Sequence, residues 1–394
     1  MKIRVITPSC VKGEMERISV HPAGIHLMEL KTSIYPLKIS DVNVKQANVI
    51  KQEALSVGAD AAVPYSVLNL ENKNVDVIVM ATLKQYRKLA LKFSQQVFGL
   101  KDLGEEMLKT IERYNRPVSG IKNKKIPEKE FLIMGILNIT PDSFSDGGTY
   151  FDNVDAAIQR AIEMQQQGAD IIDIGGESSR PGASPISEEE EIRRVIPVIK
   201  GLRGKVSCLI SCDTSRSNVA IRAIEEGADI INDIYALKRD EKMAQLIVES
   251  GCAVILMHMK GTPETMQKKP FYDDVIEEIT DFFDERIQFS LDHKISEDQI
   301  ILDPGIGFGK RIQDNLEIIK RIREFTCFNL PLCLGTSRKS FIGKIAGNPS
   351  ETERLPGTIA TCVSGYINGA RIFRVHDVKQ MYQALKLTSE IYNC

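Results

Sequence analysis

Polar residues that could carry chemistry follow a series of short apolar runs in the last two thirds of the chain. Hydrogen-bond acceptors follow three of these runs, at Asp213, Asn232 and Asp303. Carboxylate and amide groups at the mouth of an apolar site suit a flat heterocycle with several N–H donors, and the carboxylates can stabilise positive charge that forms on it. These residues therefore indicate a base-like ligand.

Cationic residues follow several of the other runs. Arg180, Lys339, Arg374 and His376 accompany glycine-rich turns that expose backbone N–H groups. Such groups bind phosphate or pyrophosphate, which is a common ligand near the last two strands of a (β/α)8 barrel. The second part of the ligand is therefore predicted to be anionic.

The apolar runs that must position these residues recur at regular intervals. Each is followed by a polar turn and a segment of helical period, and two of the intervening helices are predicted to end at Gly168 and Gly251. Residues 131–394 hold eight such units of about 33 residues, the size of one strand, one helix and two loops. The eight runs are FLIMGILN, DIIDIGG, VSCLISCD, DIINDI, CAVILMH, QIILDPG, LPLCLGT and RIFRVHD.

This rhythm predicts an α/β fold, a (β/α)8 TIM barrel in which all strand C-termini open on one face. Residues that follow the different runs should then converge. An open doubly wound sheet is the alternative, but no GxGxxG motif follows the first run.

A domain boundary is predicted near residue 125. The stretch from Asn115 to Glu128 combines Pro, Gly, Ser and clustered Lys with little apolar periodicity, which is typical of an exposed connector. Residues 1–125 are predicted to form a small α/β accessory domain of undetermined role, because their polar residues form no chemical cluster. Residues 126–394 are assigned to the barrel.

Composition narrows the function. The 394 residues include 51 Lys and Arg against 53 Asp and Glu, a net charge of -2, with no basic stripe for nucleic acid and no polybasic membrane anchor. We find no signal-peptide core or apolar run long enough to span a bilayer and expect a cytoplasmic protein. The 8 cysteines are scattered, so we expect reduced thiols.

Each polar residue also has a structural interpretation. Asp213, with Thr214 and Ser215, could simply cap a helix, and lone basic residues are usually solvated. His258 lies between two methionines and is more simply a packed group than a ligand. No HExxH or CxxC spacing predicts a zinc site. The collective pattern favours function, because independent capping would not place polar groups after all eight runs.

Two long loops follow the first two runs, from Asp142 to Gly148 and from Ser178 to Ala183. They are rich in Gly, Pro, Ser and Asp, a composition suited to lids that close over a ligand and exclude water. Phe144 would be an apolar contact of the first lid. Ordinary surface loops are the alternative.

Eight ordered motifs give the barrel a family resemblance: MGILNITPDSFSDGG, DIGGESSRPGA, DTSRSNVA, INDI, MHMKG, ILDPGIGFGK, GTSRKSFIG and RVHDV. Together they resemble dihydropteroate synthase over residues 131–394. The resemblance implies a pterin-binding TIM barrel and a transferase that joins 6-hydroxymethyl-7,8-dihydropterin pyrophosphate to p-aminobenzoate, releasing pyrophosphate, in folate biosynthesis. It also implies Mg2+ as cofactor, a homodimer and a sulfonamide target.

Site residues follow from the resemblance, motif by motif. It implies catalytic roles for Asp213, Arg180 and Lys339. It implies a pterin subsite, a pyrophosphate subsite with Asn138 also a ligand of Mg2+, and a p-aminobenzoate and lid region. The three sets are Asp213, Asn232, Asp303 and Lys339; Asn138, Arg374 and His376; and Phe144, Ser179, Arg180, Phe308 and Ser337.

Departures from the family pattern are small. Ser179 stands where many members have Thr, and Ile306 replaces a common aromatic residue. A pterin-dependent methyltransferase, which passes a methyl group to a corrinoid, is one alternative; it would not need the TPDSFSDGG and SRKS segments. A non-catalytic pterin-binding relative is the other, and it should have lost its lid or its cations.

Overall fold

The computed structural model describes residues 2–69, 74–97, 99–118, 129–140, 153–178, 185–263 and 265–393. Contacts divide the chain into two compact units, Met1–Arg116 and Pro117–Cys394. The division falls within the stretch from Asn115 to Glu128. The predicted Phe144, Ser179 and Arg180, and most of both predicted lids, lie outside the described residues.

The first unit is a three-stranded antiparallel sheet with helices, in the strand order β1-β3-β2. Val77, Val79 and Ala81 on β3 face its core and alternate with the more exposed Ile78 and Met80. This period of two is that of a strand with one covered face. The elements are α1 (Val11–Arg17), α2 (Pro22–Glu29), β1 (Ile34–Val42), α3 (Val44–Ser56), β2 (Asp60–Ala62), β3 (Val75–Thr82), α4 (Leu83–Phe93) and α5 (Leu100–Asn115). The small α/β domain predicted from the sequence is thereby confirmed.

The second unit is a barrel of eight parallel strands in the order β10-β11-β4-β5-β6-β7-β8-β9. The ring closes where Leu302 of β9 pairs in parallel with Leu332, just before β10, and donates its backbone N–H to Pro331 O at 2.9 Å. The strands are β4 (Leu132–Asn138), β5 (Ile171–Gly175), β6 (Leu209–Asp213), β7 (Ile230–Asp233), β8 (Ala253–Met257), β9 (Ile300–Asp303), β10 (Cys333–Leu334) and β11 (Ile372–Val375). All eight predicted runs are strands, so the TIM barrel prediction is confirmed.

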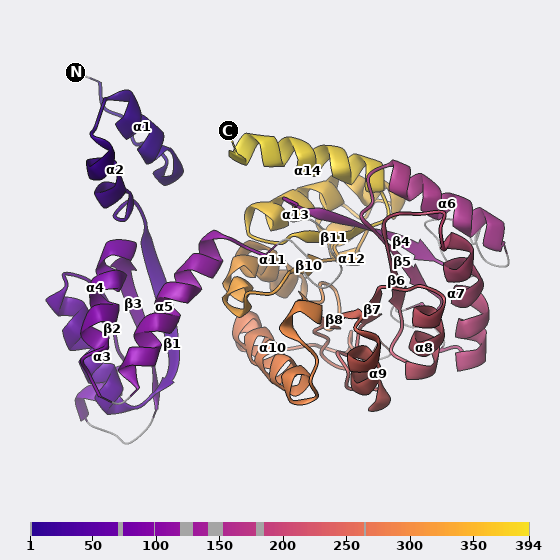
Figure 1. Cartoon of the computed structure of the whole chain (residues 1–394), viewed down its shortest axis with the longest axis horizontal. Helices are drawn as coiled ribbons and strands as arrows, with labels where there is room; N and C mark the ends of the chain where they lie inside the picture. Colours follow the sequence, from indigo (N-terminus) through magenta and orange to yellow (C-terminus); the bar gives the residue numbers. More distant parts are fainter. Residues whose placement is uncertain are drawn as a thin grey trace. The chain divides into compact units, whose positions relative to one another are not determined.

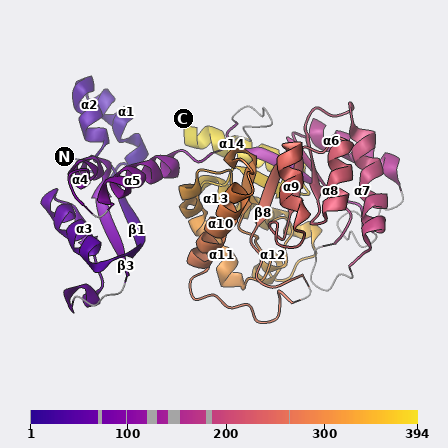
Figure 2. The same cartoon turned by 60° about the horizontal axis from the view of Figure 1, so that its bottom comes forward.

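Helices surround these strands in both views (Figures 1 and 2). Gly168 and Gly251, predicted to end helices, have φ angles of 106° and 65°, which a glycine adopts without a steric penalty. The helices are α6 (Val154–Gln166), α7 (Glu188–Leu202), α8 (Ser217–Glu225), α9 (Lys242–Ser250), α10 (Val275–Asp292), α11 (Ile312–Arg321), α12 (Ser340–Ile345), α13 (Leu355–Ile367) and α14 (Val378–Asn393).

The interior of the barrel changes from apolar to polar along the strands. Leu132, Ile171, Ile230 and Ile372 belong to one buried apolar cluster inside the barrel. Two residues further along their strands, three of these positions become Asp173, Asn232 and Arg374. Side chains two residues apart point the same way from a strand, so these polar groups form the floor of the barrel mouth.

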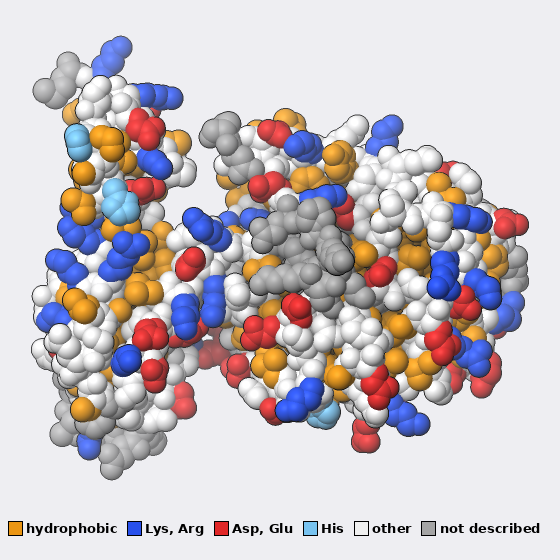
Figure 3. All heavy atoms as spheres, in the orientation of Figure 1, with side chains coloured by type: hydrophobic (Ala, Val, Ile, Leu, Met, Phe, Trp, Pro, Cys, Tyr) orange, Lys and Arg blue, Asp and Glu red, His pale blue; other side chains and the backbone are white. Residues whose placement is uncertain are grey.

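The surface carries mixed charge. Lys and Arg side chains alternate with Asp and Glu over the face seen in Figure 3, in keeping with the near-zero net charge. Among the described residues no helix is long and apolar enough to cross a membrane. No disulfide joins any of the seven described cysteines.

Candidate active site

A pocket of about 420 Å³ opens where the strands end. It is lined by seven of the nine predicted site residues that the structure describes: Asn138, Asp213, Phe308, Ser337, Lys339, Arg374 and His376. The other two, Asn232 and Asp303, are 4% and 6% exposed and lie at the C-terminal ends of β7 and β9, on either side of β8. Residues up to 238 positions apart in the sequence, as Asn138 and His376 are, thus share one hollow.

Strand register brings three of these residues into one row across the barrel. Asn138 pairs with Gly175, Gly175 with Asp213, and Asp213 with Asn232. Gly175 leaves the space between its neighbours open, because a Cβ there would lie 3.5 Å from both Asn138 Oδ1 and Asp213 Cβ. An amide oxygen and a carboxylate therefore border the same gap.

Asp173 is a site residue that sequence reasoning missed. Its side chain is fully buried, and it accepts hydrogen bonds from Ser211 Oγ at 2.7 Å, Asn232 Nδ2 at 3.2 Å and Arg374 Nε at 2.6 Å. A buried carboxylate is tolerated only with such partners. A carboxylate inside the apolar run DIIDIGG was the available signal.

Asp213 and Arg374 form the central ion pair of the pocket, with Arg374 Nη2 2.6 Å from Asp213 Oδ2. Burial raises the pKa of Asp213 to about 7; Arg374 opposes this shift and Asp173 adds to it. The guanidinium thus donates to two carboxyl groups at once, through Nε to Asp173 and through Nη2 to Asp213. Arg374 therefore helps to keep Asp213 ionised in the pocket.

Lys339 and Asp303 form a second charged region. Burial lowers the pKa of Lys339 to about 8, and Asp303 opposes the shift. Burial raises the pKa of Asp303, which Lys339 and a hydrogen bond from Gly305 N counteract. Lys339 Nζ also donates to Ile306 O and lies 4.7 Å from the centroid of the Phe308 ring. This part of the pocket joins a cation to an aromatic face.

Ser337 and His376 lie side by side in the pocket lining. Ser337 Oγ is 2.9 Å from His376 Nδ1 and accepts a bond from His376 N at 3.2 Å. Both polar groups therefore fix the turn after β11. Ile306, flagged as a departure from the family pattern, is fully buried in the core between strands and helices.

His258 is a packed group, as the sequence interpretation favoured. It is 6% exposed, and its ring lies edge-on to Phe282 with centroids 4.9 Å apart. Burial lowers the pKa of His258 well below its ordinary value, so the ring is neutral. The described residues include no group of three or more His, Cys, Asp or Glu side chains that could hold a metal ion.

Comparison with known proteins agrees with this geometry. Residues 134–376 match the family model of pterin-binding enzymes. Dihydropteroate synthase of Escherichia coli (strain K12) is 46% identical over 255 residues, which cover 65% of this chain and 89% of that protein. The crystal structure of Yersinia pestis dihydropteroate synthase with a sulfonamide drug superposes with a TM-score of 0.65 and 41% identity, covering 67% of this chain and 94% of that one.

One further relative extends over the first unit. A probable bifunctional folylpolyglutamate synthase/dihydropteroate synthase of Haloferax volcanii is 36% identical over 385 residues, covering 95% of this chain and 45% of that protein. An alignment of that extent must include most of residues 1–116. The accessory unit therefore has a counterpart in another protein.

The fold and the matched residues define the class, that of the pterin-binding TIM barrel enzymes. Within this class the chain belongs to the dihydropteroate synthase family. Its activity is the transfer of a dihydropterin group from its pyrophosphate to p-aminobenzoate, which confirms the activity predicted from the sequence motifs.

Proposed function

We propose that the pocket holds the two halves of the pterin substrate on two sets of side chains. Asp213, Asn232, Asp303 and Lys339 bind the pterin ring, and Asn138, Arg374 and His376 bind the pyrophosphate. The observation that carries this proposal is the Arg374–Asp213 ion pair in one pocket of about 420 Å³, which Asn138, Lys339 and His376 also line. That volume is in the range of small-molecule sites.

Binding exchanges the partners of Arg374. The guanidinium of Arg374 forms one ion pair with Asp173 and another with Asp213. A pyrophosphate competes for the guanidinium as a bidentate anion. Asp213 is then released to accept N–H groups of the ring. Binding of the pyrophosphate thus frees Asp213, the carboxylate that stabilises the pterinyl fragment when the pyrophosphate departs.

Magnesium fits the pyrophosphate end. Mg2+ usually takes one or two protein oxygen ligands and completes its shell with water and substrate phosphates. Asn138 Oδ1 borders the open space over Gly175 and supplies such an oxygen. When bound, the ion would neutralise charge on the departing pyrophosphate.

The chain's own residues provide electrostatic catalysis. Asp213, as the carboxylate, stabilises positive charge on the pterinyl fragment while Arg374 and His376 hold the pyrophosphate. The amine of p-aminobenzoate then attacks the pterinyl carbon and loses a proton. Phe308 and Ser337 lie near this second substrate. No protein nucleophile is required.

The proposed residue roles are tested by a coupled assay of pyrophosphate release with both substrates. Purified wild-type enzyme should release pyrophosphate only when both are present. Asn138→Ala should raise the Mg2+ concentration needed for half-maximal rate. A variant with an unchanged magnesium requirement contradicts the metal role of Asn138.

The enzyme is further proposed to be a cytoplasmic homodimer. Symmetric dimers are the commonest assemblies of soluble enzymes. Light scattering of the full chain should give about twice the 44.0 kDa mass of one subunit. A mass of one subunit at micromolar concentration contradicts the dimer.

A further inference from the structure

The loop after β9, residues 305–309, is called the glycine loop here, and its Gly307 and Phe308 line the pocket. Every one of its five carbonyl groups accepts a hydrogen bond. The donors to residues 305, 306, 307, 308 and 309 are Phe308 N (3.1 Å), Lys339 Nζ, Gln267 Nε2 (3.0 Å), Lys310 Nζ (3.1 Å) and Tyr272 OH (2.9 Å). A loop so fully bonded forms a fixed wall of the pocket.

Lys310 contributes a buried donor that bonds to more than the glycine loop. Its side chain is in a residue only 4% exposed, and Nζ lies 3.1 Å from Phe308 O, 3.2 Å from His258 O and 2.9 Å from His258 Nδ1. Three acceptors thus surround Nζ, which is the number of N–H donors in an ammonium group. In the part of the chain that is described, no carboxylate forms an ion pair with it.

His258 connects Lys310 to the pterin side of the pocket. Its backbone N–H donates to Asp303 O at 2.9 Å. Because the ring is neutral, Nδ1 can accept the bond from Lys310 while Nε2 carries the proton. Lys310 and His258 therefore link the end of β8 and the end of β9 to the glycine loop.

The backbone packing around this link is tight. A Cβ on Gly305 would lie 1.9 Å from His258 O, and one on Gly309 would lie 2.2 Å from Lys260 O. Neither position has room for any side chain. The glycine loop consequently lies directly on residues 258–260, and Lys310 reaches across the contact between them.

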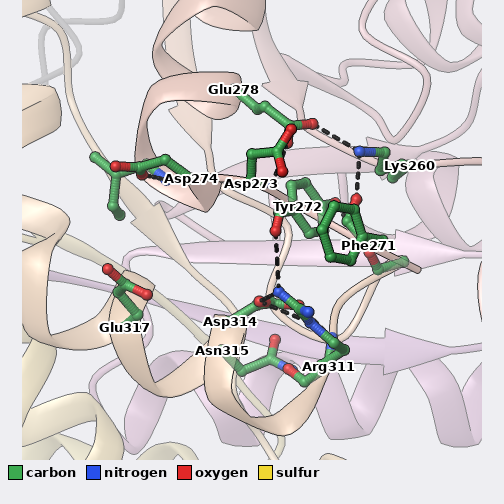
Figure 4. A network of polar contacts seen from close by, with 12 residues as sticks. Lys260, Phe271, Tyr272, Asp273, Asp274, Glu278, Arg311, Asp314, Asn315 and Glu317 are labelled. Atoms are coloured by element: carbon green, nitrogen blue, oxygen red, sulfur yellow. Dashed lines mark hydrogen bonds and ion pairs between the residues drawn. The ribbon is translucent and has the colours of Figure 1, made fainter. Parts of the chain in front are cut away.

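Helix α11 holds the other side of the glycine loop. Asn315 Oδ1 accepts a bond from Gly307 N at 2.6 Å, and Asn315 Nδ2 donates to Arg311 O at 2.8 Å. Figure 4 shows Arg311, Asp314 and Asn315 together at the start of this helix. Arg311 is held by Asp314 and donates to Tyr272 O at 3.3 Å. The glycine loop is thus braced from both sides.

We infer that Lys310 is a positioning residue of the reaction: by holding Phe308 O and both acceptors of His258, it sets the placement of the Phe308 ring and of Lys339 for the incoming p-aminobenzoate. This inference rests on the proposed placement of that substrate. Lys310 itself does not line the pocket, so it acts through Phe308 and through the glycine loop.

The test compares Lys310→Met, which removes all three donors at similar length, with Lys310→Gln, which keeps two N–H donors. Lys320→Met on the exposed side of α11 is the matched control. Misplacement of a reacting group by about 1 Å costs about a hundredfold in rate. In Lys310→Met we therefore expect kcat/KM for p-aminobenzoate to fall about a hundredfold, with Kd for the dihydropterin pyrophosphate changed less than about threefold.

Lys310→Gln should recover about a tenth of the wild-type kcat/KM, because its amide can still donate to part of the acceptor set. Wild-type values for p-aminobenzoate in folded Lys310→Met overturn the inference, as does an equal loss for both substrates, which marks a general loss of structure. Inactive wild-type enzyme would instead contradict the activity itself.

Gln267→Leu keeps the inference testable if Lys310→Met does not fold. Gln267 is exposed and holds only the neighbouring carbonyl, Gly307 O. Removing one neutral hydrogen bond should raise KM for p-aminobenzoate about fivefold. An unchanged KM in this variant shows that the glycine loop does not position the second substrate and overturns the inference.

Discussion

The two units of this chain bury different kinds of side chain. In the described part of the first unit every buried side chain is apolar or the ring of Tyr86. In the barrel, Asp173, Asn232 and Asp303 are buried within the mouth, beside an apolar core that fills the space between strands and helices. Burying such groups is unfavourable unless each is bonded. A cluster of buried polar side chains therefore indicates a functional site.

The difference also bears on the role of each unit. The buried carboxylates of the barrel are bonded to Arg374, Ser211 and Asn232, and their arrangement surrounds a pocket. Polar groups of the first unit instead cap the starts of helices, as in the capping boxes of Asn43 with Gln46 at α3 and Thr82 with Gln85 at α4. The first unit is therefore expected to contribute structure rather than catalysis.

The largest expected effect comes from Asp213→Asn. Loss of the carboxylate should lower kcat about a hundred- to a thousandfold, the usual result of removing one group that stabilises transition-state charge. The exposed Asp298→Asn, at the opposite end of the barrel strands, is the control and should leave kcat unchanged. Pyrophosphate release measures both, and a fully active Asp213→Asn would refute the role given to the barrel mouth.

Arg374→Met should come next. Loss of charged hydrogen bonds, each worth about 1.5–3 kcal/mol, should weaken dihydropterin pyrophosphate binding about 10- to 100-fold. Calorimetric titration gives the dissociation constants, and hydroxymethyl dihydropterin without pyrophosphate is the control ligand. Equal weakening of both ligands would assign Arg374 to the ring instead of the anion.

A smaller effect concerns pH. The pKa of Asp213 rises from its ordinary 3.8 to about 7 on burial, so the folded enzyme holds a proton between these values that the unfolded chain has lost. As the pH falls from about 7 to about 4, Asp213 becomes protonated, and kcat/KM should decrease by up to about tenfold per pH unit. Over the same range the free energy of unfolding should increase, because the folded enzyme binds this proton more tightly than the unfolded chain does. Rate and thermal unfolding profiles of wild type and Asp213→Asn measure both trends. Identical stability profiles would show that the pKa is not raised.

Removing residues 1–116 should change turnover less than about threefold. The Escherichia coli relative aligns with 65% of this chain yet is covered over 89% of its own length, so the barrel corresponds to nearly all of that enzyme. Turnover and solution mass of residues 117–394 provide the measurement. A loss beyond tenfold in folded protein would give the first unit a part in catalysis.

The smallest effect is expected within the first unit. Tyr86 OH lies 2.7 Å from both Tyr35 O and Val79 O, and these two carbonyls share its one proton. Tyr86→Phe should therefore destabilise this unit by about 1–3 kcal/mol, because the two carbonyls lose the donor that they share. Chemical denaturation followed by hydrogen exchange in β3 reports the change, while kcat should stay at the wild-type value. A lower kcat would contradict this prediction and show that the first unit affects catalysis in the barrel.

Sequence alone determined the barrel and most of its mouth. Eight apolar runs with a fixed spacing predict eight strands, and residues that follow them, such as Asn138, Asp213 and His376, must converge once the strands are parallel. The helix-ending Gly168 and Gly251 were predicted for the same reason, since a left-handed residue favours glycine. These predictions depend only on local pattern and on one rule of topology.

Tertiary structure decided which side chains pair. Asp173 lies inside an apolar run, and the parallel pairing of β11 with β4 and of β4 with β5 brings it to Arg374, 201 positions away. Lys310 follows the glycine turn after β9, and packing buries it against His258, which follows a different strand, β8. The hydrophobic pattern along a chain determines which face of a strand a side chain lies on. Which side chain it pairs with depends on strand register, on barrel closure and on the close backbone contacts that glycines permit.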